Sequence, residues 1–293
     1  AHALLKSIDT AEASTCNGVL GVYINSDLED GGFTGIPHDV VPPASDGTQP
    51  NVPHRPILAK DKVRYVGEPV AIVVADTALQ ALDGAELIDV EYEELPAAAS
   101  IQKALLDDAP ILFDENQNNL LVHWSMGDRG ATDKVFEKAD QIISINLTNN
   151  RIAPTALEPR AAITEYDTQT GQYTLTTGSQ GSHKLKEWIT GKNDKRAANI
   201  EPENLRVICP DVGGGFGMKN FLFNEPLAAL FATKIIGRPV KWTGDRTESF
   251  LNDTHGRDQL NHGELAITND GKFLGIRVSS VGNVGAYVSQ FGA

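Results

Sequence analysis

The chain has 293 residues, 41% of them hydrophobic and 22% charged, which is typical of a globular protein with one large domain or two smaller ones. Its formal net charge of −14 disfavours nucleic acid as a partner, because phosphate backbones bind basic surfaces. The longest apolar run, residues 69–75, is too short to span a bilayer, and Cys16 and Cys209 form no metal-binding spacing.

Residues 1–97 predict a small α/β domain. β-branched or alternating residues indicate its strands, and apolar residues at helical spacing indicate its helices. The predicted elements are, in order, a strand at 4–9, a short helix at 10–15, a strand at 19–24, a loop at 28–56, a strand at 69–75, a helix at 78–88 and a strand at 88–96. The last three predict a βαβ-like unit.

Residues 98–130 predict a linker, because their periodicity is weak and Asn and Asp are frequent. A second domain is predicted for residues 131–293. Its elements are, in order, a helix at 131–140, strands at 141–149, 161–166 and 172–177, a helix at 182–190, a strand at 205–212, a helix at 224–236, a strand at 238–246 and a strand-rich segment at 258–289 with a turn at 268–272. This mixture predicts an α+β (mixed α/β) fold.

A glycine-rich loop at 213–217, interrupted by Phe216, lies between a predicted strand and a helix. Backbone N–H groups bind phosphate in this order of elements. The P-loop pattern fails because Asn220 follows Lys219, and the dinucleotide fingerprint fails because Met218 stands where it needs a glycine. From these residues alone, an anion site and a tight turn without a ligand both remain open.

Two polar motifs accompany the loop. Gln180 lies in a glycine-flanked turn, where its amide can donate and accept hydrogen bonds, although a surface turn with Ser182 as helix N-cap is the simpler interpretation. Glu158 and Arg160 precede a predicted strand. Glu158 could pair with Arg160 or with another cation, it could shape a channel, or the segment could be a solvated loop.

Taken in order, these stretches resemble the molybdenum hydroxylases, the family of xanthine dehydrogenases, aldehyde oxidases and the large subunit of aerobic carbon monoxide dehydrogenase. Residues 65–97 are similar to the family's a/b hammerhead domain, and residues 153–186 and 206–259 are similar to its molybdopterin-binding region. The stretches "GGGFGMKNFLFNEP" and "RPVKWTGDRTE" are closest to the carbon monoxide dehydrogenase-like branch.

The resemblance implies a molybdopterin cofactor carrying molybdenum, in the cytosine dinucleotide form of many bacterial members. It also implies oxidation of a carbon centre, in an aldehyde, an N-heterocycle or a carbon monoxide-like substrate, with oxygen taken from water. Electrons then leave through [2Fe–2S] clusters and FAD. Because such clusters need cysteine ligands and this chain has two cysteines, these groups are expected on an iron–sulfur subunit and an FAD subunit of a cytoplasmic hetero-oligomer.

The resemblance also implies roles for individual residues. Gln180 matches the glutamine that hydrogen-bonds an oxygen ligand of molybdenum, and Phe216 matches the residue that lines the substrate side, so both are expected to be catalytic. The residues expected to contact the cofactor are Gln180, Gly181, Gly214, Gly215, Phe216 and Gly217. No side chain is expected to ligate molybdenum directly. Asn220 stands where purine-oxidising members carry a glutamate, which argues against xanthine as the substrate.

The chain begins at Ala1 without a methionine and stops in a predicted strand and turn. We therefore expect a segment of a longer polypeptide, whose remaining part, with the catalytic glutamate and the substrate loop, follows Ala293. Two other functions remain open. One is a non-catalytic half of a split molybdopterin-binding subunit, and the other is a Rossmann-like nucleotide oxidoreductase, which rests only on the strand–glycine–helix order.

Overall fold

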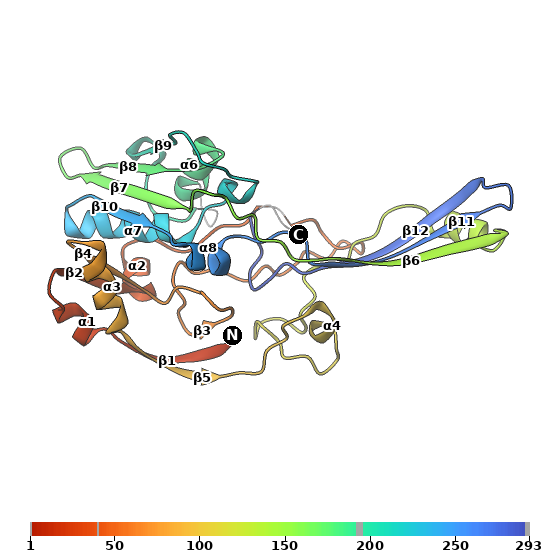
Figure 1. Ribbon diagram of the computed structural model, residues 1–293, viewed down its shortest axis with the longest axis horizontal. Helices are drawn as coiled ribbons and strands as arrows, with labels where there is room; N and C mark the ends of the chain where they lie inside the picture. The colour runs from red at the N-terminus through yellow and green to blue at the C-terminus, as the bar shows by residue number, and fades with distance from the viewer. Residues whose placement is uncertain (1, 40, 192–195, 291–293) are drawn as a thin grey trace.

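A computed structural model describes residues 2–39, 41–191 and 196–290 (Figure 1). The body of the molecule holds three small sheets, and a long arm of three strands extends from it (Figure 1). The mixed content of helices and strands confirms the predicted α+β class. None of the helices in the described ranges is long and apolar enough to cross a membrane.

The N-terminal part forms two antiparallel sheets, with strand orders β3-β1-β5 and β2-β4. Its elements are β1 (Ala3–Asp9), α1 (Ala11–Thr15), β2 (Val19–Ile24), α2 (Asn25–Asp30), β3 (Lys62–Val63), β4 (Ala71–Ala75), α3 (Ala78–Glu86) and β5 (Asp89–Glu94). The strands and helices predicted here are present, whereas α2 and β3 were not predicted.

The predicted βαβ-like unit is wrong in its pairing, because β4 and β5 belong to different sheets. Strand β5 carries Asp, Glu and Tyr and is largely exposed. Such a strand suits the antiparallel partner that β1 provides, whereas a parallel βαβ sheet is buried on both faces and needs apolar strands. The alternating pattern predicted that a strand exists but could not identify its neighbour.

The C-terminal part contains a four-stranded sheet in the order β10-β7-β8-β9 and the three-stranded arm in the order β12-β11-β6. Its elements are α4 (Ile101–Ala104), α5 (Arg129–Phe136), β6 (Gln141–Asn149), β7 (Ala161–Asp167), β8 (Gln172–Thr177), α6 (Ser182–Thr190), the 3₁₀ turn η2 (Pro202–Asn204), β9 (Leu205–Ile208), the 3₁₀ turn η3 (Met218–Asn220), α7 (Asn224–Ile236), β10 (Val240–Thr243), α8 (Arg246–Asn252), β11 (Gln259–Ile267) and β12 (Phe273–Gly282).

This topology contradicts the Rossmann-like alternative. β8 and β9 are parallel, whereas β7 pairs antiparallel with both β8 and β10. A dinucleotide-binding fold needs a mostly parallel sheet and a glycine loop that opens directly into a helix. Here the glycine loop leads into η3, and α7 begins only at Asn224.

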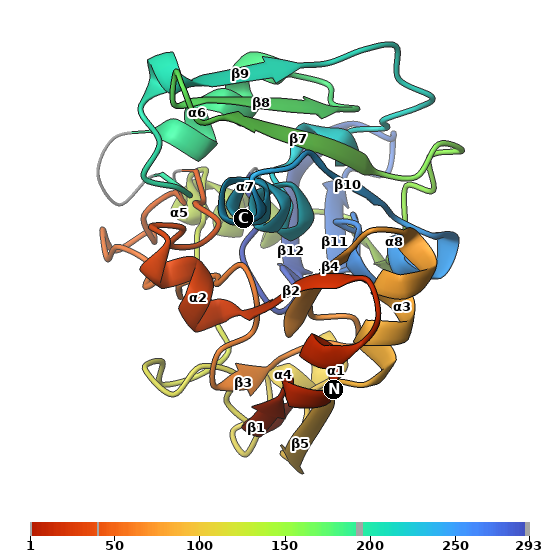
Figure 2. The same ribbon diagram turned by 90° about the vertical axis from the view of Figure 1, so that its left-hand side faces the viewer.

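Helix α7 is the centre of the core. Its residues from Pro226 to Thr233 are all buried, as expected for a helix that is apolar on every side. It packs on β7 and β10, and its Phe231 makes edge contacts with Tyr23 and Phe33 from the N-terminal part. In Figure 2, α7 lies between the four-stranded sheet and the N-terminal elements. One core therefore crosses both predicted domains, whose boundaries stay a prediction.

The segment predicted as a linker is tied to the N-terminal part. Lys62 pairs with Asp114 at 2.9 Å, and the Ser125 N–H donates to Ser45 Oγ at 2.6 Å. The turn predicted at 268–272 is present at the tip of the arm, where it joins β11 to β12. Helix α5 covers one face of the arm, since Val135 and Phe136 lie against Gly275.

Candidate functional site

The glycine loop makes a sharp bend between β9 and η3. Gly214 and Gly217 have φ of +101° and +84°, a conformation that residues with a side chain rarely adopt. Phe216 between them also has a positive φ, of +50°, and the residue is 74% exposed. A bulky residue held in this region is strained, and such strain persists where the surrounding structure imposes it.

Gln180, in the turn between β8 and α6, lies against this loop. Its backbone N–H donates to the Lys219 carbonyl at 3.0 Å, and its Oε1 accepts from the Gly217 N–H at 2.9 Å. A Cβ added at Gly215 would lie 2.5 Å from Gln180 Oε1, so glycine is what allows the carboxamide to approach. The fold thus brings together two motifs that are separate in the sequence.

Several donors at this point have no acceptor. Within the described ranges, the N–H groups of Gly214, Gly215 and Phe216 make no hydrogen bond, and neither does the Gln180 Nε2 amide. An added Cβ at Gly217 would meet no heavy atom within 4 Å, so there is open space beside the loop. Successive free backbone N–H groups suit an anionic group with several oxygen or sulfur atoms.

Gly181 and Asn220 lie at the edge of this arrangement. Gly181, and not the predicted Ser182, occupies the N-cap position of α6, and its N–H donates to Ser179 Oγ at 3.1 Å. Asn220 is half-buried, and its Oδ1 lies 3.9 Å from the position of a Cβ added at Gly181. The neutral carboxamide of Asn220 therefore stands beside the turn that carries Gln180.

Glu158 pairs with another cation, one of the alternatives left open by the sequence, and not with Arg160; the sequence did not identify that cation as Lys219. Lys219 Nζ donates to Glu158 Oε2 at 2.6 Å, and the same oxygen accepts the Gly213 N–H at 2.7 Å. The hydrogen bond from Lys219, and then that from Gly213, holds the pKa of Glu158 below its usual value. One signal was available: Lys219 stands between glycines and an apolar helix, with no carboxylate within five residues of it in sequence.

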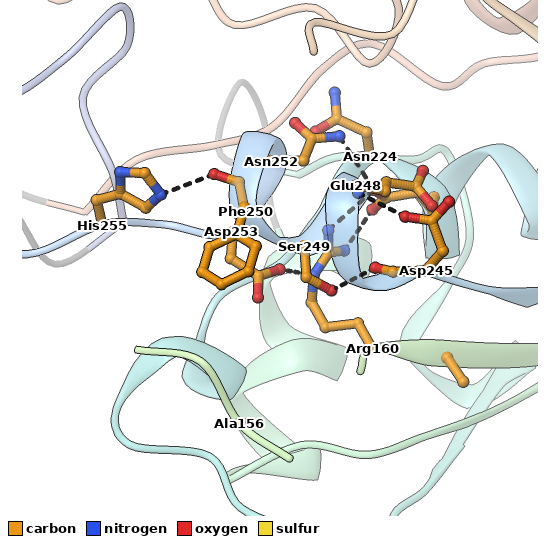
Figure 3. Close-up of polar contacts among 12 residues, drawn as sticks. Ala156, Arg160, Asn224, Asp245, Glu248, Ser249, Phe250, Asn252, Asp253 and His255 are labelled. Atoms are coloured by element: carbon orange, nitrogen blue, oxygen red, sulfur yellow. Dashed lines mark hydrogen bonds and ion pairs between the residues drawn. The ribbon is translucent and has the colours of Figure 1, made fainter. Parts of the chain in front are cut away.

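Arg160 serves a different region. Its Nε donates to Asp253 at 2.6 Å, and its two terminal nitrogens donate to the Glu225 carboxylate at 2.6 and 3.0 Å. Figure 3 shows Arg160 reaching toward α8 and Asp253. Burial alone would lower the pKa of this guanidinium, but Glu225 and Asp253 raise it, so the charge is retained. The predicted solvated loop is wrong at Arg160, because the side chain is buried.

The same network reaches the N-terminal part. Asn252 donates to Glu225 at 3.3 Å and accepts from the Tyr65 hydroxyl at 2.7 Å. Burial raises the pKa of Tyr65 to about 12. Asn224, at the start of α7, accepts from Arg55 at 3.2 Å and donates to the Ile57 backbone carbonyl. Polar groups thus join residues 55–65 of the N-terminal part to α7 and α8.

A cavity of about 20 Å³ lies between the loop and this network, lined by Arg160, Thr177, Ser179 and Lys219 among others. This volume is about that of one water molecule, so the cavity is too small for a cofactor or for an aromatic ring. A ligand of the loop must therefore lie on its open side, where Phe216 and Gly217 are exposed.

Comparison with known proteins identifies the family. Residues 112–293 match the family model of the molybdopterin cofactor-binding domain, and residues 1–96 match that of the a/b hammerhead domain of aldehyde oxidase and xanthine dehydrogenase. The resemblance inferred from the sequence is thereby confirmed.

Individual relatives support the same grouping. The carbon monoxide dehydrogenase large chain of Afipia carboxidovorans is 31% identical over 299 aligned positions, which cover 98% of this chain and 35% of the relative. The nicotine 6-hydroxylase large subunit of Paenarthrobacter nicotinovorans is 30% identical, with coverage of 98% and 34%. The crystal structure of quinoline 2-oxidoreductase from Pseudomonas putida 86 superposes with a TM-score of 0.86 at 32% identity, with coverage of 98% and 35%. The chain spans about a third of the length of these relatives.

Proposed function

This chain belongs to the molybdopterin-binding family of aldehyde oxidases and xanthine dehydrogenases, and on that premise we propose that it forms one wall of the molybdenum centre of a hydroxylase. The observation that carries the proposal is the contact between Gln180 and the glycine loop, with four donor groups left free around open space. These donors fit the anionic groups of molybdopterin, and the glycines allow the close approach that a bulky cofactor needs.

Each residue has a distinct part in this proposal. The N–H groups of Gly214, Gly215 and Phe216 donate to anionic atoms of the cofactor, with Gly181 and Gly217 leaving room beside it. The Gln180 Oε1 already accepts from the Gly217 N–H, so the Nε2 amide is the group that would donate to an oxygen ligand of the bound cofactor. When bound, the cofactor would supply the two-electron redox chemistry of the oxidation, with oxygen taken from water. The exposed Phe216 ring lines the substrate side.

The substrate is an aldehyde, an N-heterocycle or a carbon monoxide-like molecule. Asn220 supports the exclusion of xanthine, since a neutral carboxamide can neither carry the charge nor accept the proton that a glutamate would at this position. The names of two relatives, a nicotine hydroxylase and a quinoline oxidoreductase, favour N-heterocycles as the first compounds to test.

The complete enzyme is a hetero-oligomer in this proposal. We expect the cytosine dinucleotide form of the cofactor, an iron–sulfur subunit with [2Fe–2S] clusters, an FAD subunit and the remaining part of the molybdopterin subunit. Support comes from the bacterial relatives, which are described as large chains or subunits. A cytoplasmic location is expected, and the free thiols of Cys16 and Cys209 suit such a reducing compartment.

The decisive experiment is Gln180→Ala in the complete enzyme complex. Molybdenum is measured by plasma mass spectrometry, pterin by fluorescence after oxidation, and turnover with a panel of aldehydes and N-heterocycles. We expect nearly unchanged molybdenum and pterin, and a kcat lower by ~10²-fold, the effect of removing one preorganised donor. Gln172→Ala is the control, because Gln172 bonds to Glu203 and Asn204, away from the loop.

Two results would reject this proposal. One is a parent complex that contains neither molybdenum nor pterin. The other is a Gln180→Ala complex in which cofactor content and turnover fall by the same factor, since the glutamine would then have only a structural role.

A further inference from the structure

We propose that the Glu158–Lys219 ion pair is a positioning device that sets the distance between the Gln180 amide and the free N–H groups of the glycine loop. This inference rests on the proposed function, since it assigns the pair to the same site. Neither residue is expected to touch the substrate, so both are positioning residues.

The first observation is the burial of Lys219. Its side chain is 1% exposed, and Nζ meets Glu158 Oε2 at 2.6 Å. An ammonium group pays a large desolvation cost in such a place and is retained only when it is paired and hydrogen-bonded. A methionine would fill the same space at no such cost, so stability by itself does not explain a lysine here.

The second observation is how Glu158 holds the loop. Its Oε2 accepts from the Gly213 N–H at 2.7 Å, while its own N–H donates to the Gly213 carbonyl at 3.2 Å. Both backbone groups of the first loop residue are therefore bound to one glutamate. A Cβ at Gly213 would lie 2.7 Å from the Glu158 Cβ, so the two backbones meet without room for a side chain.

The third observation is the other end of Lys219. Its carbonyl accepts from the Gln180 N–H at 3.0 Å and from Ser179 Oγ at 3.1 Å. The ammonium end thus fixes the loop through Glu158, and the carbonyl end fixes the Gln180 turn. Lys219 therefore connects the glycine loop to the Gln180 turn, and the free donors lie on these two segments.

The exposure of Glu158 separates this pair from an ordinary buried ion pair. Its side chain is 45% exposed, so it can turn to water if Lys219 is neutralised, without leaving a charge trapped in the core. Loss of the lysine should therefore loosen the loop while the chain remains folded. A purely structural pair would lower stability and leave the bound centre as active as before.

The experiment compares Lys219→Met and Glu158→Gln in the complete enzyme complex. The readouts are Tm, molybdenum and pterin content, and kcat divided by the molybdenum bound. Lys62→Met is the matched control, because Lys62 is also a buried lysine paired with one exposed carboxylate, Asp114, but lies on β3 in the N-terminal part. Glu158→Gln keeps an oxygen that can accept from Lys219 and Gly213 and removes only the charge.

We expect kcat per bound molybdenum to fall about tenfold in Lys219→Met and about threefold in Glu158→Gln, because small displacements of a positioned group have large effects on rate. Lys62→Met should change Tm and leave kcat per molybdenum within about twofold of the parent. If Lys219→Met does not assemble, Glu158→Gln decides the matter.

Values of kcat per molybdenum within twofold of the parent in both variants would overturn the positioning role and leave the proposed function intact. Absence of molybdenum and pterin from the parent complex would instead reject the proposed function. The two failures are therefore distinguishable.

Discussion

Glu158 and Arg160 are two residues apart, yet their side chains lie in two regions that differ in burial and in how their charges are paired. Around Arg160, one guanidinium is enclosed by two carboxylates, and the side chains of Arg160, Glu225 and Asp253 are all at most 10% exposed. Beside Glu158, one buried ammonium faces a carboxylate that is 45% exposed, and among the described residues the N–H groups of Gly214, Gly215 and Phe216 have no acceptor.

This difference distinguishes a network that stabilises the fold from a loop that can bind a ligand. The Arg160 network satisfies its polar groups internally and packs the guanidinium 3.8 Å above the Phe223 ring, which leaves nothing for a ligand. The glycine loop leaves donors unpaired where solvent or a ligand can reach them. The network should therefore determine stability, and the loop should determine cofactor binding and turnover.

The largest expected effect is that of Arg160→Met. It leaves Glu225 and Asp253 buried without a counter-charge and should lower the free energy of unfolding by about 3–5 kcal/mol, measured by urea denaturation. Arg238→Met is the control, because Arg238 and its partner Asp76 are both about half-exposed, and it should cost less than about 1 kcal/mol. Equal costs for the two variants would contradict the assignment of Arg160 to a buried network.

A smaller effect on stability is expected from Gly215→Ala. The added Cβ displaces the Gln180 carboxamide and breaks its hydrogen bond with Gly217, at a cost of about 1 kcal/mol. In the complete complex, kcat per molybdenum should fall as it does in Gln180→Ala. Gly130→Ala in α5 is the matched control, since its Cβ meets no atom closer than 3.6 Å. An unchanged kcat per molybdenum in Gly215→Ala would show that the contact with Gln180 does not affect turnover.

The smallest effect concerns Glu248, beside the Arg160 network. Burial, and then the charge of Glu225, raises the pKa of Glu248 above 4.5. A carboxyl group whose pKa is raised in the folded state contributes stability below its unfolded pKa, and this is lost as the pH rises through the folded pKa. Glu248→Gln should therefore show a smaller decrease in Tm than the parent as the pH rises above 4.5.

The matched comparison is Glu158→Gln, which should have the opposite sign. The pKa of Glu158 is lowered, so its contribution is present above pH 4.5 and is lost as the pH falls through the folded pKa. Parallel pH profiles of Tm for the two variants would contradict the contrast between the regions.

Much of the local structure could be predicted from the sequence. The apolar run of α7 and the alternating residues of β7 and β8 have periods that match their elements, so these were placed to within a residue or two. Helix α8 was missed, because the predicted strand ended at residue 246 and no element was predicted for residues 247–257. Its N-cap is Asp245, whose side chain accepts from the Glu248 N–H.

The candidate site was only partly predictable. Gln180 and the loop at 213–217 were identified from the order of their motifs, and the fold places them in contact. Lys219 and Arg160 could not be matched to partners, because Glu158 is 61 residues from Lys219 and Glu225 is 65 residues from Arg160. The local sequence around a carboxylate does not indicate which distant cation it will pair with.

The sequence by itself determined most of the elements, the position of the glycine loop and the family, because each of these depends on residues close together in the chain or on the order of motifs. The tertiary structure decided which strands pair, which charges compensate one another and which donors remain free. These outcomes depend on distances between segments that are far apart in sequence, and hydrogen bonds and ion pairs act only at short range.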